Sequence, residues 1–256
     1  MDSSYTAAPR RQRPQSPVLV ILPTYNEAEN VTPLCEHLLQ LDPPVDVLIV
    51  DDASPDGTSD VAARLVQTYP DRIFLTVRHD ARGRGSAVEH GFRRAMERGY
   101  EWCLEMDADF SHDPADIPRF IAARDDADVV VGSRNIAGGG VVGWHWRRHL
   151  LHRLASGYAR WLVGPTTTDQ TNGFRLYRVD ALRAVPLVSP SAGYVGQTLR
   201  AFFLHRAGKR IRDVPVIFHE RRAGQSKMSA REAFHGAWML LRYRLQWGTK
   251  VRKPLR

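Results

Sequence analysis

Two aspartates, Asp107 and Asp109, stand one residue apart directly after the largely apolar run Trp102–Met106. That run is typical of a buried strand, and residues i and i+2 at the end of a strand point the same way. Two such carboxylates could hold one Mg²⁺ or Mn²⁺ ion, because these cations prefer oxygen ligands and usually bind one or two carboxylates together with substrate phosphates. The alternative is structural, since acidic residues collect at helix N-termini and Asp113 and Pro114 could begin the next helix. This motif alone leaves both interpretations open.

Polar segments also follow two other runs that are typical of strands. Residues Pro23–Glu27 follow Val18–Leu22, and residues Asp51–Thr58 follow Val47–Val50. A ring and carboxylates at these places could contact a nucleobase and a ribose. Each segment could instead be a simple turn, because Asn caps helices and Ser-Pro-Asp-Gly is typical of turns. Their occurrence after two successive strands favours a ligand site.

The elements that must position these residues follow an alternating pattern. Strands are predicted at 18–22, 47–50, 73–77, 102–106 and 129–131, and amphipathic helices at 27–41, 58–69, 85–98 and 114–124. This rhythm predicts an α/β fold with a mostly parallel sheet flanked by helices, in which ligands bind at the carboxyl ends of the strands. Further helices are predicted at 149–163, 193–207 and 229–247, and a strand at 211–218.

Composition restricts the possible partners. The chain has 256 residues, 43% of them apolar, and a net charge of +8, which favours an anionic partner. Nucleic acid is not expected, because no nucleic-acid-binding module is recognisable, and a dinucleotide oxidoreductase lacks its Gly-x-Gly-x-x-Gly motif. Two cysteines, Cys35 and Cys103, exclude a disulfide framework and indicate a reducing compartment. No apolar run reaches the roughly 18 to 20 residues that cross a bilayer, so a cytoplasmic protein is expected.

Several motifs together resemble the dolichyl/polyprenyl-phosphate mannosyltransferases among the inverting GT-A glycosyltransferases. They lie at Pro23–Glu27, Val50–Thr58, Glu105–His112, Gly132–Gly139, Thr171–Arg175 and Val214–Met228. The resemblance implies a GT-A catalytic domain at 17–228, after a disordered basic arm at 1–16 and before a helix and basic tail at 229–256. It also implies metal-dependent, inverting transfer of mannose from GDP-mannose to a polyprenyl (dolichyl-type) phosphate.

The resemblance also implies roles for individual residues. The nucleotide sugar would contact Pro23, Tyr25, Glu27, Val50, Asp52, Ala108, Asp109, Arg221 and Lys227. Mg²⁺ or Mn²⁺ would bind Asp107 and Asp109, with Ser111 as a weaker third ligand. The acceptor phosphate would contact Arg134 and Arg148. Asp107, Asp109, Arg134, Arg221 and Lys227 would form the catalytic set.

The segment Glu220–Lys227 also fits a phosphate-binding loop on its residue types alone. Arg221 offers a planar fork of donors, Lys227 a compact charge, and Gly224 a hinge. The alternative is a solvated basic loop without a ligand.

Three segments depart from the family pattern. Leu199 stands where relatives commonly have Glu, Arg82–Ser86 replaces the usual Gly-Leu-Gly-Thr, and Arg147 and His152 differ near the expected acceptor loop. Transfer to a phosphate acceptor can proceed without a general base, because the second pKa of a phosphate is about 6 and the acceptor is largely ionised at neutral pH. The departures leave open a related glycosyltransferase with another donor or acceptor, and a catalytically weakened partner subunit.

The C-terminal helix carries two apolar stripes. One comprises Phe234, Ala237, Trp238, Leu241 and Leu245, and the other Leu240, Tyr243 and Trp247. One stripe is expected to pack on the domain. The other is expected either to lie at the cytoplasmic face of a membrane, where Trp, Tyr and basic residues are favoured, or to be buried as well. A separate membrane-anchored partner is a further possibility for attachment.

Overall fold

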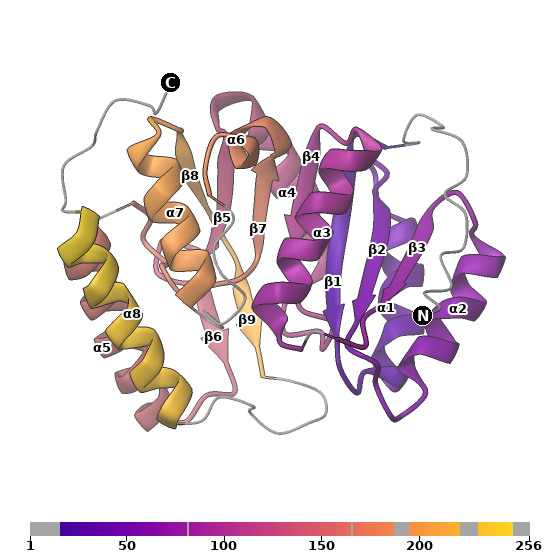
Figure 1. The fold of residues 1–256 in the computed structure, drawn as a ribbon, viewed down its shortest axis with the longest axis horizontal. Helices are drawn as coiled ribbons and strands as arrows, with labels where there is room; N and C mark the ends of the chain where they lie inside the picture. The colour runs from indigo at the N-terminus through magenta and orange to yellow at the C-terminus, as the bar shows by residue number, and fades with distance from the viewer. Residues whose placement is uncertain (1–15, 81, 165, 187–194, 221–229, 248–256) are drawn as a thin grey trace.

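The computed structural model describes residues 16–80, 82–164, 166–186, 195–220 and 230–247. Its centre is a seven-stranded sheet with the order β3-β2-β1-β4-β7-β5-β8, flanked by helices on both faces (Figure 1). The strands are β1 Val18–Thr24, β2 Asp46–Asp51, β3 Ile73–Val77, β4 Trp102–Glu105, β5 Val129–Ser133, β7 Arg175–Arg178 and β8 Ile211–Pro215. The predicted α/β class with a mostly parallel sheet is therefore confirmed.

The helices overlap the predicted ranges, except for α6 (Val179–Arg183), which was not predicted. They are α1 Ala28–Leu39, α2 Thr58–Thr68, α3 Arg84–Arg98, α4 Ile117–Ala122, α5 Trp146–Val163, α6 Val179–Arg183, α7 Gly196–Arg206 and α8 Ala230–Trp247, with short 3₁₀ turns at Pro114–Asp116 and Arg124–Asp126. No helix within the described ranges is both long and apolar enough to cross a membrane.

Strand β7 was not predicted, and it is antiparallel to both of its neighbours, β4 and β5. It begins with Arg175 and ends with Arg178, so its sequence lacks the apolar pattern of a central strand. Arg175 is nevertheless fully buried, because its guanidinium donates to the backbone carbonyls of Asn172, Asp169, Gln170 and Gln197. These hydrogen bonds offset the cost of removing the charge from water.

The single strand predicted at 211–218 is wrong. The chain forms β8 and then, after Val216, a separate strand β9 (Ile217–His219) that pairs with β6 (Gly140–Val142) in a two-stranded sheet. Pro215 ends β8, since proline has no N–H for a sheet ladder. The backbone of Val216 then bonds to both sides, donating to Ser133 and accepting from Gly140.

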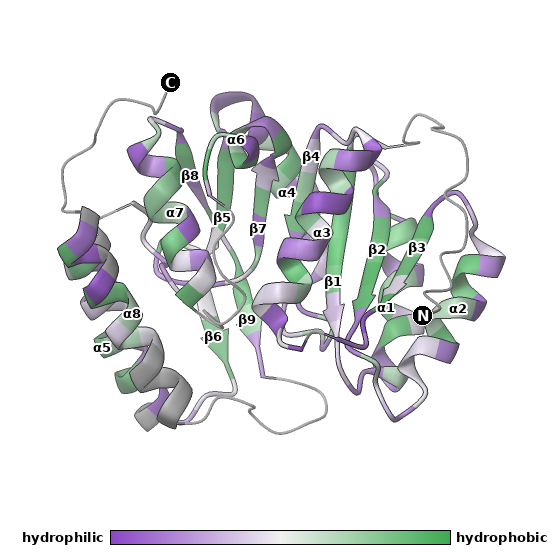
Figure 2. Ribbon diagram, viewed as in Figure 1, coloured by the Kyte–Doolittle hydropathy of each residue, from purple (hydrophilic) through white to green (hydrophobic). Residues whose placement is uncertain are grey.

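Alternating residues of β1 divide the core into two clusters, one on each face of the sheet. Val18, Val20 and Leu22 pack in a cluster that includes α1, whereas Leu19 and Ile21 pack in a cluster that includes α3, α7 and α8. Figure 2 shows the same arrangement, with hydrophobic strands between helices whose outer faces are mixed or polar. This two-faced burial explains why the parallel strands have nearly continuous apolar sequences.

Ser16 and helix α8, at the two ends of the described chain, each differ from the prediction. Ser16, which the expected basic arm included, is buried and donates from Oγ to the carbonyl of Pro44 (2.6 Å); residues 1–15 lie outside the described ranges. In α8, Leu240 is buried, whereas Trp238 is 56% and Leu245 76% exposed. A helix buried on both stripes is therefore excluded for these positions, and the side chains of Phe234, Tyr243 and Trp247 lie outside the described part.

Candidate active site

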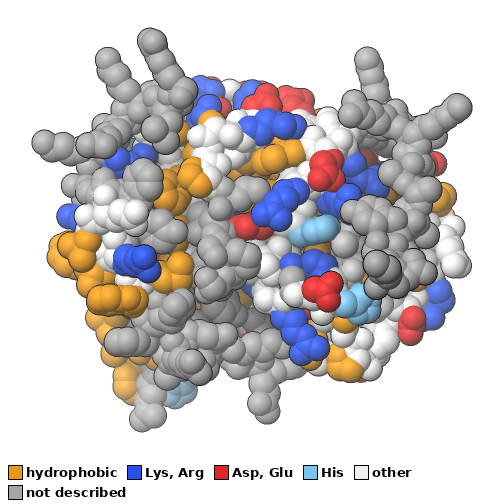
Figure 3. All heavy atoms as spheres, viewed as in Figure 1, with side chains coloured by type: hydrophobic (Ala, Val, Ile, Leu, Met, Phe, Trp, Pro, Cys, Tyr) orange, Lys and Arg blue, Asp and Glu red, His pale blue; other side chains and the backbone are white. Residues whose placement is uncertain are grey.

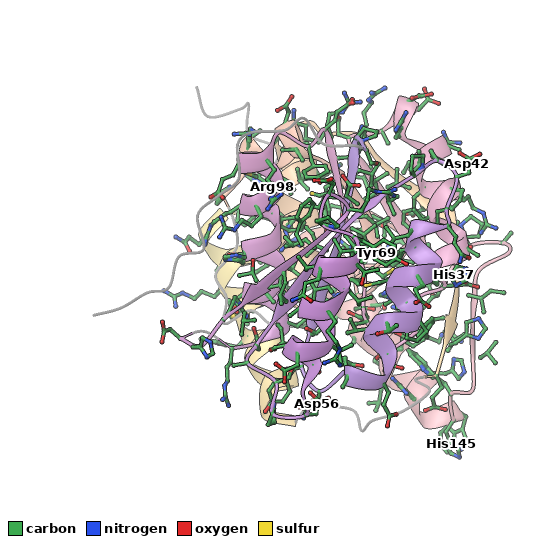
Figure 4. All side chains as sticks on the ribbon, turned by 90° about the vertical axis from the view of Figure 1, so that its right-hand side faces the viewer. His37, Asp42, Asp56, Tyr69, Arg98 and His145 are labelled. Atoms are coloured by element: carbon green, nitrogen blue, oxygen red, sulfur yellow. The ribbon has the colours of Figure 1, made fainter. Side chains whose placement is uncertain are left out.

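The polar segments after the parallel strands meet at one edge of the sheet, as predicted. In Figure 4, Asp56 and His145 lie at the lower end of the molecule, where the parallel strands end, while Arg98 lies toward the opposite end. The first two segments are joined by hydrogen bonds from the backbone of Asn26 to Ser54 Oγ (3.0 Å) and of Ala28 to Asp56 Oδ2 (3.1 Å). The two segments therefore lie against each other at this edge.

The residues expected around a nucleotide occupy different environments. Pro23, Tyr25 and Glu27 are partly exposed at this edge, whereas Val50 is fully buried in the core. The carboxylate of Asp52 is also buried, where it accepts hydrogen bonds from the guanidinium of Arg78 and from the backbone N–H of Gly83 (2.7 Å). Asp52 therefore fixes the loop that precedes α3.

A cavity of about 370 Å³ lies beside that loop, and none of the expected nucleotide-binding residues that the structure describes lines it. Its lining residues are Val77, Arg78, His79, Asp80, Ser86, Glu89, His90 and Arg93.

The two aspartates of the predicted metal site lie in a loop and not on a strand, because β4 ends at Glu105. Strand periodicity therefore does not set their directions. Asp107 Oδ1 accepts from Arg84 Nε (2.7 Å), and Asp109 Oδ1 accepts from the backbone of Ser111 (3.0 Å). Ala108, between them, is nearly fully buried. These contacts hold both carboxylates on one short loop.

The residues of this loop fit a hard divalent cation. Ser111 is fully buried, and its Oγ has no hydrogen-bond partner among the described residues. Asp107, Asp109 and Ser111 all offer oxygen, the ligand type that Mg²⁺ and Mn²⁺ prefer. Within the described ranges, no group of three or more His, Cys, Asp or Glu side chains is suited to a metal. Two carboxylates and one hydroxyl would leave positions of an octahedral Mg²⁺ open for ligand oxygens.

The cap and first turn predicted at Asp113 and Pro114 are present. Asp113 accepts the backbone N–H of Ala115 (2.9 Å), and Pro114 begins the short 3₁₀ turn. Capping is thus performed by Asp113 and does not account for Asp107 and Asp109.

His112 joins the aspartate loop to the loop before β7, a link that the sequence did not reveal. Its Nδ1 accepts the backbone N–H of Asp107 (3.1 Å), and its Nε2 lies 3.0 Å from Asn172 Oδ1. Burial lowers the pKa of His112. The ring is therefore neutral near pH 7 and carries its proton on Nε2, which donates to Asn172. The ring also stacks on Phe174 at a centroid distance of 4.8 Å.

Arg134 is held by Asp169, which the sequence indicated only as part of a polar segment. Arg134 Nε lies 2.6 Å from Asp169 Oδ2 and Nη2 lies 2.8 Å from Oδ1, and both side chains are nearly inaccessible. Burial of Asp169 opposes ionisation, but the hydrogen bonds and charge of Arg134 outweigh it and lower the pKa of Asp169 to about 2. Asn172 completes the connection, because its backbone N–H donates to Asp169 Oδ1 (3.1 Å).

Trp144 brings the two arginines of the expected acceptor site together. The guanidinium carbons of Arg134 and Arg148 lie 5.6 and 4.3 Å from its ring centroid, and Arg148 also pairs with Glu220 (3.3 Å). His152 packs edge-on against the same ring, and its Nε2 and the Nε1 of Trp144 are buried without a partner in the described part of the chain. Arg147 has no described side chain.

The remaining site predictions have different outcomes. Arg221 and Lys227 lie outside the described residues.

Leu199 is fully buried in the core, but the adjacent Arg200 donates to the buried carboxylate of Glu105 (3.3 Å). Arg84 binds the other oxygen of Glu105 (2.7 Å) as well as Asp107. The departure of residues 82–86 from the family pattern was the signal that could have identified Arg84.

Comparison with known proteins supports the motif-based resemblance. The model of Glycosyl transferase family 2 matches residues 19–185. An undecaprenyl-phosphate mannosyltransferase of Micrococcus luteus is 45% identical over 213 residues, which are 83% of this chain and 87% of that protein. A polyprenol monophosphomannose synthase of Mycolicibacterium smegmatis is 38% identical over 246 residues, 95% of this chain and 91% of that protein.

Solved structures show the same fold at low sequence identity. Mannosyl-3-phosphoglycerate synthase from Rubrobacter xylanophilus superposes with a TM-score of 0.66 at 18% identity, covering 91% of this chain and 75% of that one. Glucosyl-3-phosphoglycerate synthase from Mycobacterium tuberculosis, solved with Mn²⁺, uridine diphosphate and phosphoglyceric acid, gives 0.62 at 15% identity, covering 91% and 79%.

Proposed function

The chain belongs to glycosyl transferase family 2 and to the family of the two polyprenyl-phosphate mannosyltransferases that it resembles, and from this we propose its reaction. It transfers mannose from GDP-mannose to a polyprenyl phosphate, with inversion and with a divalent metal. The observation that carries the proposal is the continuous chain of contacts between Asp107, His112, Asn172, Asp169 and Arg134. It connects a loop suited to a metal–diphosphate with an arginine suited to a second phosphate.

The donor half of the reaction uses the loop at the end of β4. Asp107, Asp109 and Ser111 would hold Mg²⁺ or Mn²⁺, and when bound the metal neutralises charge that develops on the leaving diphosphate. Tyr25, Glu27 and the β2–α2 loop contact the nucleotide. Fixed hydrogen bonds within these loops reduce the reorganisation needed when the donor binds.

The acceptor half uses the arginines that flank Trp144. Arg134 is oriented by Asp169, and Arg148, on α5, lies over Trp144. These two guanidinium groups would together bind the acceptor phosphate. A phosphate acceptor is already ionised at neutral pH, and attack on the anomeric carbon therefore requires alignment more than proton removal. Asp169, paired with Arg134 and with a pKa of about 2, is unsuited to act as a base near pH 7.

Helices α5 and α8 supply a surface for the lipid part of the acceptor, at the cytoplasmic face of the membrane. They lie side by side, and hydrophobic side chains gather over them at the left of Figure 3. Their exposed apolar residues are Trp146, Leu150, Leu151, Leu154, Trp161, Trp238 and Leu245, with Arg153, Arg160 and Arg242 exposed among them. Trp, Leu and Arg in this mixture favour a membrane interface. The opposite face of α5 carries His152 toward Trp144, so one helix joins the lipid surface to the phosphate site.

The proposal is tested by sugar transfer with purified protein, polyprenyl phosphate in vesicles and Mn²⁺ or Mg²⁺, comparing labelled GDP-mannose with UDP-glucose. We expect metal-dependent transfer of mannose to the lipid, lost in Asp107→Ala and retained in the capping control Asp113→Ala. Transfer from UDP-glucose alone would instead identify another donor. No lipid product from either donor would point to a partner subunit that has lost its chemistry.

A further inference from the structure

We propose that Arg84 is a donor-binding and positioning residue, which holds Asp107 and presents its remaining N–H groups to an oxygen of the donor diphosphate. The proposal rests on the proposed function for the identity of the donor class, a nucleoside diphosphate sugar.

Arg84 is fixed by two carboxylates. Its Nε lies 2.7 Å from Asp107 Oδ1, and its Nη1 lies 2.7 Å from Glu105 Oε1. Glu105 is buried at 1% side-chain exposure and is shared with Arg200, while the Arg84 side chain is 20% exposed. The guanidinium thus lies between Glu105, at the end of β4, and Asp107 in the loop that follows.

The Nη2 edge of the guanidinium has no acceptor within the described part of the chain. Arg84 Nη2 is buried and makes no hydrogen bond to any described residue. It lies over Gly173, where an added Cβ would collide with it. A buried N–H without a partner is unfavourable, and a planar guanidinium suits phosphate oxygens. An anion bound at the loop of Asp107 would supply the missing acceptor.

Helix formation does not explain this arginine. Arg84 is the first residue of α3, and the first turn of that helix contains no acidic residue. The N-terminus of a helix carries partial positive charge, which disfavours a cation there. The favourable interactions of Arg84 therefore come from the carboxylates at the site, and a ligand oxygen would complete them.

A consequence distinguishes ligand binding from a purely structural ion pair. If Arg84 contacts the diphosphate, the protein itself supplies a cation to that anion, and nucleotide binding persists in part when metal is removed. If Arg84 only neutralises Glu105 and Asp107, its replacement changes stability without specifically weakening metal-free nucleotide binding.

The test is calorimetric titration of GDP and, separately, UDP into the full chain in EDTA and then in Mn²⁺. In EDTA we expect Arg84→Met to bind the accepted nucleotide at least about tenfold more weakly than wild type, because a charge-assisted contact is lost. We expect Arg84→Lys to bind the nucleotide severalfold more weakly than wild type. Lysine keeps a cation beside Glu105, but it lacks the second N–H edge that the guanidinium has at Nη2. The matched control is Arg94→Met, an arginine on α3 that is paired with Glu97, and we expect it to match wild type.

Two results would overturn the proposal. One is wild-type affinity in EDTA for both Arg84 variants, with circular dichroism showing at least the lysine variant folded. The other is no binding of GDP or UDP by wild type in EDTA. Because neither titration involves sugar transfer, nucleotide binding that depends on Arg84, without mannose transfer to lipid, would contradict the proposed function and support this inference.

Discussion

Arg134 and Asp169, 35 positions apart in the sequence, form a two-point ion pair that is almost completely buried, with N–O distances of 2.6 and 2.8 Å. The pair fixes the plane of the guanidinium. Arg134 Nη2 also donates to Thr171 Oγ1 (2.8 Å), so three acceptor atoms on one loop set its orientation. An arginine oriented in this way costs little reorganisation when it meets an acceptor phosphate.

Replacement of Asp169 by Asn should destabilise the protein by about 3 kcal/mol, because removing one partner leaves the other charge buried without compensation. Urea unfolding of Asp169→Asn at pH 7 measures this loss. Asp126→Asn, which breaks an exposed pair with Arg212, is the matched control and should change the free energy of unfolding by less than about 1 kcal/mol. Equal stability of the two variants would show that the buried pair is not needed for the fold.

Acid should reduce stability over two pH ranges, and His152 contributes to the first together with His112 and His90, whose pKa values are also lowered by burial. Burial and the charge of Arg134 lower the pKa of His152 to about 4. Near pH 5 the unfolded chain, with a histidine pKa of about 6.5, binds a proton that the native chain does not, so stability falls as the pH falls from about 6.5 to 4. Asp169 acts lower, because its pKa of about 2 is below the unfolded value of about 3.9, and its contribution is lost between those values.

His152→Gln isolates the contribution of His152 to the loss of stability between about pH 6.5 and 4. Between pH 7 and pH 4.5 the wild-type protein should lose roughly 2 kcal/mol more stability than the variant, measured by urea unfolding at each pH. Parallel losses in the two proteins would contradict a depressed pKa at His152.

Much of the fold was predictable because its determinants are local. The apolar runs of β1, β2 and β5 are continuous, as expected for parallel strands covered on both faces. Strand β7 was not predictable, because Arg175 is buried only through carbonyls that the fold brings together. The same limit applied to Glu105, whose burial depends on arginines from α3 and α7.

The candidate site was predictable in part for the same reason. Asp107, Asp109 and Arg134 stand in local motifs, so the sequence indicated them. Asp169 and His112 act through partners that are distant in sequence, Arg134 and Asn172, and no local pattern encodes those contacts.

Ser111→Ala should weaken Mn²⁺ binding about tenfold in the presence of GDP, since it removes the one buried hydroxyl without a partner in the aspartate loop. Electron paramagnetic resonance of free Mn²⁺ measures the affinity. The thermal stability of Ser111→Ala should remain close to that of wild type, because the Ser111 Oγ makes no hydrogen bond to a described residue. Asp113→Ala is the control, and it should lower stability by about 1 kcal/mol through loss of the cap and leave Mn²⁺ affinity unchanged. Unchanged Mn²⁺ affinity in Ser111→Ala, with reduced affinity in Asp113→Ala, would exclude Ser111 as a ligand.

Leu154→Glu combined with Trp161→Glu should weaken binding to anionic vesicles roughly tenfold or more, because both side chains are over 60% exposed on α5 and would lose apolar contact with the bilayer. Vesicle co-sedimentation provides the measurement. Gln67→Glu with Thr68→Glu, on the exposed side of α2, makes the same charge change elsewhere. Equal weakening by both pairs would attribute binding to net charge and not to the surface of α5.

The most direct test of the central claim compares polyprenyl phosphate with the unphosphorylated polyprenol as acceptors for labelled GDP-mannose in Mn²⁺. The arginines beside Trp144 and the absence of a requirement for a strong base predict lipid-soluble mannose with the phosphate and none with the alcohol. Equal transfer to the alcohol, or transfer to neither lipid, would contradict a phosphate acceptor at Arg134 and Arg148.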